Sequence, residues 1–226
     1  MKVAALIPAY DEAPRIGAVI AGLLPFVARV LVVDDGSRDG TADVARAAGA
    51  EVLAQTPNGG KGLAIRAGVG RLLAGDVTHV LLLDGDGQHD PADAPALLAA
   101  AARDMPAMVI GERGFDRDFM PRSRYYTNVI SSWVISRAFI GQPVRDAQSG
   151  YRVISTDWLR RLRLTAHGYE IETEMLIKIS RLGGRIVRVP ITMRYHGAPS
   201  KLRPIRDTTR TCFLAVRYRF FPERWQ

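Results

Sequence analysis

Short, β-branched apolar runs alternate with longer helical patterns through the first half of this chain. Such alternation predicts βαβ units and a mostly parallel central sheet flanked by helices, which is the α/β class. The runs that we expect to form strands are residues 3–8, 29–34, 50–55, 78–84, 107–111 and 185–190. Asp90 followed by Pro91 matches an N-cap and a first helical residue, so we expect a helix from there to about Arg103. A further helix is expected near residues 127–139.

Acidic turns follow three of the predicted strands, at residues 8–12, 34–41 and 84–90. Ligands of an open parallel sheet bind outside the carboxyl ends of its strands. One turn rich in Asp and Gly is ordinary turn chemistry, but carboxylates from three turns repel one another unless a cation or a ligand neutralises them. Asp84 and Asp86 lie on the same side of an extended chain, where both can face one ion. Their oxygens suit Mg²⁺ or Mn²⁺.

The charge balance favours an anionic partner, because 31 Lys and Arg residues against 23 Asp and Glu residues give a net charge of +8. Two familiar nucleotide motifs are excluded. A P-loop needs a glycine five positions before Gly60-Lys61, where this chain has Gln55. The run 85–90 starts like a dinucleotide-binding fingerprint but has Asp90 in place of the third glycine, which disfavours hydride-transfer chemistry.

Three features bear on the cellular location. The single cysteine, Cys212, cannot form an internal disulfide and fits a reducing compartment. Pro8 and the polar residues after it interrupt the first apolar segment, unlike a secretory signal. The longest uncharged stretch, 16–28, is shorter than the roughly 18 to 20 residues that span a bilayer. We therefore expect a cytoplasmic protein that does not cross a membrane by itself.

An ordered series of motifs resembles family 2 glycosyltransferases with the GT-A fold. The series consists of PAYDE at 8–12, VVDDGSRDGT at 32–41, NGGKG at 58–62, DGDGQHDP at 84–91 and SGYR at 149–152. Within this family the chain is most similar to the polyprenol-phosphate sugar transferases, the group that includes dolichyl-phosphate mannose synthase. The resemblance covers residues 3–202, and it implies a GT-A catalytic domain over 1–202 followed by a basic, aromatic helical tail over 203–226.

The resemblance implies an inverting hexosyltransferase that uses a UDP- or GDP-linked sugar, Mg²⁺ or Mn²⁺, and a polyprenyl phosphate acceptor. The nucleotide would contact Pro8, Tyr10, Glu12, Asp34, Asp35, Lys61, Asp84 and Gly85. The metal would be held by the DXD-like pair Asp84 and Asp86, with Gln88. The acceptor phosphate would meet Arg122, Arg124, Ser149, Arg152 and Lys201. Asp86 and Asp146 are the expected catalytic residues, Asp146 being the base that a hydroxyl acceptor would need.

Two local patterns add smaller expectations. Glycines on both sides of Lys61 suggest a flexible loop. Glu174 and Lys178 are four residues apart on a predicted helix, and an ion pair between them gives Glu174 a structural role.

Two other functions remain open on the sequence alone. A nucleotidyltransferase that makes sugar nucleotides would share the sheet and the metal carboxylates, but it should have a basic, glycine-rich loop where this chain has PAYDE. A module that binds nucleic acid or another anion would use the positive charge, yet the ligand edge of the sheet is acidic, so we expect no nucleic acid. The tail suits an interfacial helix at the inner face of the membrane, and equally a helix packed on the core or on a second copy of the chain.

Overall fold

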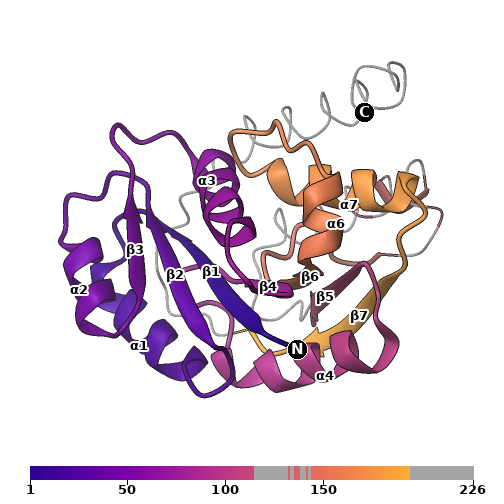
Figure 1. The fold of residues 1–226 in the computed structure, drawn as a ribbon, viewed down its shortest axis with the longest axis horizontal. Helices are drawn as coiled ribbons and strands as arrows, with labels where there is room; N and C mark the ends of the chain where they lie inside the picture. The colour runs from indigo at the N-terminus through magenta and orange to yellow at the C-terminus, as the bar shows by residue number, and fades with distance from the viewer. Residues whose placement is uncertain (115–131, 133–134, 138–140, 142–143, 194–226) are drawn as a thin grey trace.

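A seven-stranded mixed sheet organises the part of the chain that the computed structural model describes, residues 1–114, 132, 135–137, 141 and 144–193 (Figure 1). In chain order the elements are β1 (Val3–Ala9), α1 (Ala13–Leu23), β2 (Arg29–Asp34), α2 (Thr41–Ala47), β3 (Glu51–Ala54), α3 (Lys61–Leu73), β4 (His79–Leu82), η1 (Pro91–Asp93), α4 (Ala94–Asp104), β5 (Met108–Arg113), β6 (Arg152–Ser155), α6 (Thr156–Arg161), α7 (Ile171–Arg181) and β7 (Ile186–Ile191). The strand order is β3-β2-β1-β4-β6-β5-β7. Only β6 runs antiparallel to its neighbours in this sheet, so the predicted mostly parallel α/β fold is confirmed.

The elements expected from the apolar pattern occur close to their predicted positions. The side chain of Asp90 accepts a hydrogen bond from the Ala92 amide at 3.1 Å and caps η1, which leads directly into α4. The antiparallel strand β6 was not predicted as a separate element. The helix expected near 127–139 falls largely outside the described residues, and the tail over 203–226 falls wholly outside them.

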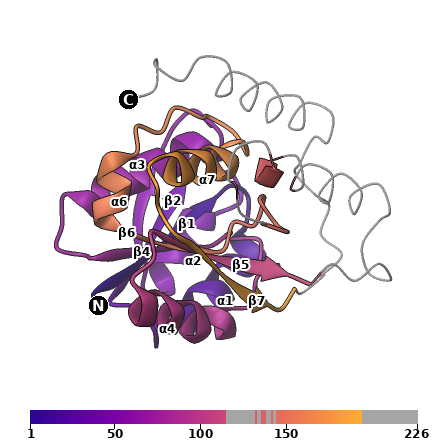
Figure 2. The same ribbon diagram turned by 90° about the vertical axis from the view of Figure 1, so that its right-hand side faces the viewer.

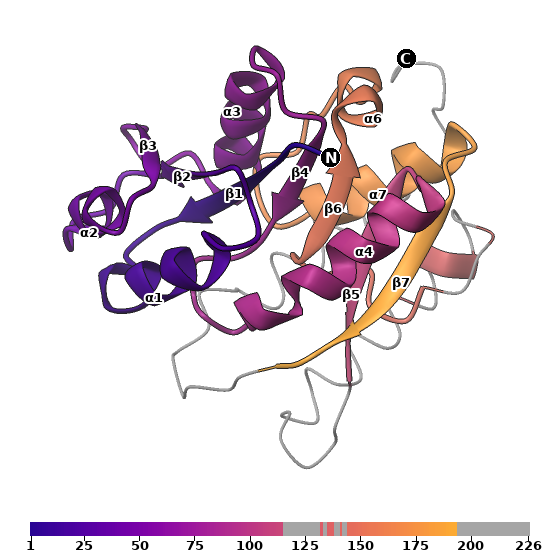
Figure 3. The ribbon, with the colours of Figure 1, turned by 60° about the horizontal axis from the view of Figure 1, so that its bottom comes forward.

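Helices cover both faces of the sheet (Figures 1 and 2). Alternate residues of β1 supply the two cores: Ala4 and Leu6 pack with α3, α6 and α7, whereas Ala5 and Ile7 pack with α1, α2 and α4. Figure 3 shows α1 and α4 lying across the second face. Burial on both faces explains why the central strand β1 is apolar throughout. Within the described residues, no helix combines the length and apolar character that crossing a bilayer requires.

Gly68 allows α3 to approach the sheet closely. A Cβ atom at this position would lie 2.3 Å from Leu6 Cδ1 and 2.9 Å from Val33 Cγ2. We expect Gly68→Ala to lower the free energy of unfolding by about 1–3 kcal/mol, the usual cost of overpacking a core. The exposed Gly70, two residues later on α3, has open space around it. The control Gly70→Ala is expected to be neutral or to stabilise by about 0.5–1 kcal/mol. Equal effects of both substitutions on urea denaturation would contradict this packing argument.

Candidate active site

The three acidic turns meet at one edge of the sheet. β2, β1 and β4 are parallel neighbours, and Ala9 pairs with Asp34 where β1 and β2 end. Asp84 and Asp86 follow β4 at the same edge. The pKa of Asp86 is raised to about 6 by burial, by the negative charge of Asp84 and, more weakly, by that of Glu12. The carboxylates that the sequence singled out are therefore close enough to interact electrostatically.

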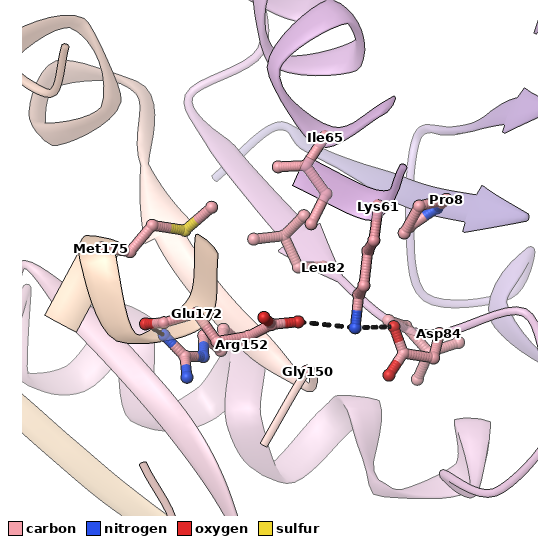
Figure 4. Close-up of a pocket in the computed structure, with 10 residues that line it drawn as sticks. Pro8, Lys61, Ile65, Leu82, Asp84, Gly150, Arg152, Glu172 and Met175 are labelled. Atoms are coloured by element: carbon pink, nitrogen blue, oxygen red, sulfur yellow. Dashed lines mark hydrogen bonds and ion pairs between the residues drawn. The ribbon is translucent and has the colours of Figure 1, made fainter. Parts of the chain in front are cut away.

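Lys61 lies at the centre of this edge. It is the first residue of α3, and its ammonium lies 2.6 Å from Asp84 Oδ1 and 2.5 Å from Glu172 Oε1 (Figure 4). The ring of Tyr169 lies 5.4 Å from the Lys61 Nζ atom, within the range of a cation–π contact. Burial opposes the charged form of Lys61, but Asp84 and Glu172 outweigh it and raise the pKa of the ammonium above its usual value.

Asp84 is the negative partner in the ion pair between Lys61 and Asp84. Burial alone would raise the pKa of Asp84, but Lys61 lowers it. The SGYR segment lies directly against the same carboxylate, because a Cβ atom at Gly150 would come within 2.6 Å of Asp84 Oδ2. Asp86 differs, since its Oδ1 atom accepts a hydrogen bond from the Gln88 amide at 3.0 Å. Two neighbouring carboxylates thus follow β4. The charge of Asp84 is neutralised by a lysine, and Asp86 accepts a hydrogen bond from a backbone amide.

The acids that end β2 have different partners. Asp34 Oδ1 accepts hydrogen bonds from the amide and the hydroxyl of Ser37 and shapes the turn that follows β2. Asp35 accepts from the amides of Gly59 and Gly60, each at 2.8 Å, one at each carboxylate oxygen. Asp35 therefore ties the end of β2 to the segment that presents Lys61.

Pro8, Tyr10, Glu12 and Gly85 surround the acidic edge. Pro8 lines the small pocket that also contains Lys61 and Asp84. Tyr10 is exposed, and Glu12 is buried with an ion pair to Arg15 at 2.7 Å. Gly85 is packed closely, since a Cβ atom there would lie 3.1 Å from Ile16 Cδ1.

The glycines around Lys61 permit close packing, which differs from the flexible loop expected from the sequence. Gly60 has a φ of +94°, and a Cβ atom on it would lie 2.6 Å from the His167 carbonyl oxygen. A Cβ atom on Gly62 would lie 2.5 Å from the Ala166 carbonyl oxygen, and the Gly62 amide donates to the His167 oxygen at 2.8 Å. The segment before α7 thus presses against the start of α3 and fixes Lys61.

Arg152 has a different environment from the one expected. Its side chain is fully buried, and its guanidinium donates to the carbonyl oxygens of Ala147, Ser149 and Glu172 at 2.8, 2.7 and 2.6 Å. Burial lowers the pKa of Arg152 to about 10. The guanidinium is occupied by the protein's own backbone, which favours a structural role over the predicted contact with an acceptor phosphate. Ser149 is buried beside it, and its hydroxyl accepts from the Tyr151 amide at 3.4 Å.

Asp146 is fully buried and paired. Its carboxylate accepts from Arg113 Nε at 2.5 Å and from Arg113 Nη2 at 2.7 Å. A carboxylate bound in this bidentate way is a poor general base, so the expected role as a base is not supported by its surroundings. The acceptor candidates Arg122, Arg124 and Lys201 lie outside the described residues.

The sequence motifs assigned no site role to Glu172, although its helix was predicted. It lies with Met175, Leu176 and Ile179 on the buried stripe of α7, at helical spacing. A carboxylate on an apolar stripe requires a partner, and this signal could have pointed to a buried cation. Glu174, two residues later, does have the expected structural role: it pairs with Lys178 at 2.9 Å and accepts from the Ala166 amide at 2.8 Å.

Comparisons with known proteins identify relatives of this chain. Residues 4–163 match the family model described as glycosyl transferase family 2. The chain is 38% identical over 208 residues to glycosyltransferase AglJ of Haloferax volcanii, covering 89% of this chain and 67% of that protein. It is 36% identical over 205 residues to the undecaprenyl-phosphate mannosyltransferase of Micrococcus luteus, covering 85% of this chain and 83% of that protein.

A solved structure shows the same fold. The complex of Mycobacterium tuberculosis glucosyl-3-phosphoglycerate synthase with Mn²⁺, UDP and glucosyl-3-phosphoglycerate superposes with a TM-score of 0.76 at 23% identity. The alignment covers 96% of this chain and 79% of that one. This likeness confirms the expected GT-A architecture. The residues that match the family model, 4–163, include the acidic edge of the sheet and Lys61. Because this match spans most of the chain, the chain belongs to glycosyl transferase family 2.

Proposed function

We propose that this protein transfers a hexose, with inversion, from a UDP- or GDP-linked sugar to a polyprenyl phosphate, and that Mg²⁺ or Mn²⁺ assists the reaction. The observation that carries the proposal is the pairing of Asp84 with Asp86 beside Lys61 at the carboxyl edge of a GT-A sheet. The lipid acceptor is supported by the similarity to the Micrococcus luteus mannosyltransferase. Family membership favours this function over a nucleotidyltransferase or a nucleic-acid-binding module.

The donor site is assigned to the edge formed by β1, β2 and β4. Asp34 would accept hydrogen bonds from the base or ribose, with Pro8, Tyr10, Glu12 and Gly85 around it. We assign Asp35 to holding the Gly59–Gly60 segment, through which it positions Lys61 for the diphosphate. A carboxylate and a lysine around one pocket suit a nucleotide that carries a diphosphate.

The residues at this edge also fit a divalent cation. Burial and Asp84 hold the pKa of Asp86 at about 6, so a cation beside the pair would relieve the electrostatic cost of its charge. Among the described residues no three His, Cys, Asp or Glu side chains form a complete metal centre. Mg²⁺ commonly binds through one or two carboxylates together with substrate phosphates, which matches Asp84 and Asp86, with Gln88 beside them. When bound, the cation offsets negative charge on the departing diphosphate.

For a phosphate acceptor, the site needs a group that binds the anion more than it needs a general base. A phosphate monoester oxygen is largely ionised near neutral pH and can attack directly. We assign Asp146 to holding Arg113, the last residue of β5. A guanidinium fixed in this way suits a phosphate. Arg122, Arg124 and Lys201 stay predictions for the same phosphate, and the tail over 203–226 stays a predicted membrane contact at the cytoplasmic face.

A thermal-shift panel tests the donor. We expect UDP or GDP to raise the melting temperature in MnCl₂ and to raise it much less in EDTA, because a ligand that binds only the native state stabilises it. At a concentration of about 100 times its Kd, a nucleotide adds about 2.7 kcal/mol to the free energy of unfolding. ATP and AMP serve as controls for unspecific binding. No shift with any UDP or GDP ligand would contradict the proposal.

Transfer assays test the acceptor with the same preparation. The nucleotide sugar that shifts the melting temperature is incubated with undecaprenyl phosphate, with 3-phosphoglycerate or with no acceptor. Sugar transfer to the lipid phosphate alone is the expected result. Transfer to 3-phosphoglycerate alone would overturn the lipid acceptor and leave the glycosyltransferase assignment in place.

A further inference from the structure

Glu172 is a buried carboxylate that none of the sequence motifs of the active site contains. It extends from α7 toward the start of α3, and Figure 4 shows it on the opposite side of Lys61 from Asp84. The Lys61 ammonium lies 2.5 Å from Glu172 and 2.6 Å from Asp84. One buried cation thus bridges two anions from different parts of the fold.

The two anions are not equivalent. Asp84 belongs to the pair that we assign to a divalent cation, whereas Glu172 lies on α7, on the other side of the lysine. A cation at Asp84 repels the nearby ammonium, and a buried ammonium without any anion is costly. Glu172 supplies the anion that Lys61 keeps when Asp84 binds the cation. The surrounding segment is closely packed, because Gly60 and Gly62 lie against the residues before α7.

We propose that Glu172 is a positioning residue, which holds the Lys61 ammonium beside Asp84 so that Lys61 contacts the donor diphosphate when the cation is bound. This inference rests on the proposed function, since it assumes a nucleotide diphosphate at this edge. Glu172 does not contact the reacting atoms and acts through Lys61. Its removal therefore weakens donor binding only while Lys61 is present.

A double-mutant cycle tests this dependence. The four proteins are the wild type, Glu172→Gln, Lys61→Met and the double variant, and the probes are UDP and GDP, each titrated in MnCl₂ by calorimetry. We expect Glu172→Gln to weaken binding of the preferred nucleotide about tenfold, within the range of coupling energies of residues in contact. In the Lys61→Met background the same substitution is expected to change affinity less than about twofold. A merely structural glutamate would weaken binding equally in both backgrounds.

Stability gives a second readout that needs no ligand. In EDTA, Lys61→Met leaves Glu172 buried without its ammonium, so this variant is expected to melt below the wild type. The double variant is expected to melt above Lys61→Met, because it removes the unpaired charge. This comparison keeps the inference testable if Glu172→Gln alone is poorly folded. A double variant that melts at or below Lys61→Met would overturn it.

Two controls separate the possible failures. Glu51→Gln removes the same charge from a surface pair with Arg29 at the start of β3, and nucleotide affinity should stay at the wild-type level. Glu172→Asp keeps the charge and should restore part of the lost affinity. Equal nucleotide affinity of wild type and Glu172→Gln would overturn this inference alone. If the wild type bound neither UDP nor GDP in MnCl₂, the proposed function and this inference would both fall.

Discussion

Asp86→Asn is expected to stop sugar transfer while making the metal-free protein more stable. Burial and the charge of Asp84 raise the pKa of Asp86 to about 6, so its ionised form is costly at neutral pH. Asparagine has the same shape without the charge. Since one pKa unit corresponds to about 1.4 kcal/mol, the rise from 3.8 to about 6 makes the gain about 3 kcal/mol, or several degrees in melting temperature. Transfer should fall by a factor on the order of 10³, because the cation contributes several kcal/mol to stabilising the departing charge.

Melting curves in EDTA and in MnCl₂, together with initial transfer rates, measure both effects. Asp90→Asn is the matched control in the same turn, because asparagine can replace aspartate as the N-cap of η1. This control should keep the Mn²⁺ response and the transfer rate. An Asp86→Asn protein that is less stable in EDTA and still responds to Mn²⁺ would show that Asp86 is a structural residue.

The sheet and its acidic edge could be predicted because their signals are local in the sequence. The strands β1, β2 and β4 are largely apolar runs, and the acidic turn after each of them is the next segment of the chain. Parallel neighbours then bring Asp34 and Asp84 to the same edge without any knowledge of side-chain contacts. The motif series resembled family 2 glycosyltransferases, and the family match confirms that resemblance.

The partners of the charged residues could not be predicted in the same way. Lys61 meets Glu172, and Asp146 meets Arg113, across long stretches of chain whose approach depends on how α7 and β5 pack. Arg152 is the last residue of the SGYR motif, which favoured a ligand contact over a structural role. Composition cannot distinguish an arginine that binds a phosphate from one that binds backbone carbonyls, because both need the same donors.

A second large effect is expected at Arg152. Arg152→Met removes the donors for three carbonyl oxygens, those of Ala147, Ser149 and Glu172. Each buried acceptor left without a partner costs about 1–3 kcal/mol. We expect the free energy of unfolding to fall by roughly 3–5 kcal/mol and the melting temperature by about 10 °C. Arg152→Lys should recover little, because a lysine cannot match the planar fork of donors that reaches separate carbonyls.

Urea denaturation of Arg152→Met and of a matched control decides between the two roles of this arginine. Arg160 is exposed and donates to the Leu73 carbonyl at 3.1 Å, so Arg160→Met should cost less than about 1 kcal/mol. Comparing the loss of stability in Arg152→Met and Arg160→Met then distinguishes a buried structural guanidinium from an exposed one. If Arg152→Met instead unfolded like the wild type and lost only its response to undecaprenyl phosphate, Arg152 would be an acceptor-binding residue, as the motif alone had suggested. The three carbonyl bonds predict the opposite order, with stability lost first and acceptor binding affected only as a consequence.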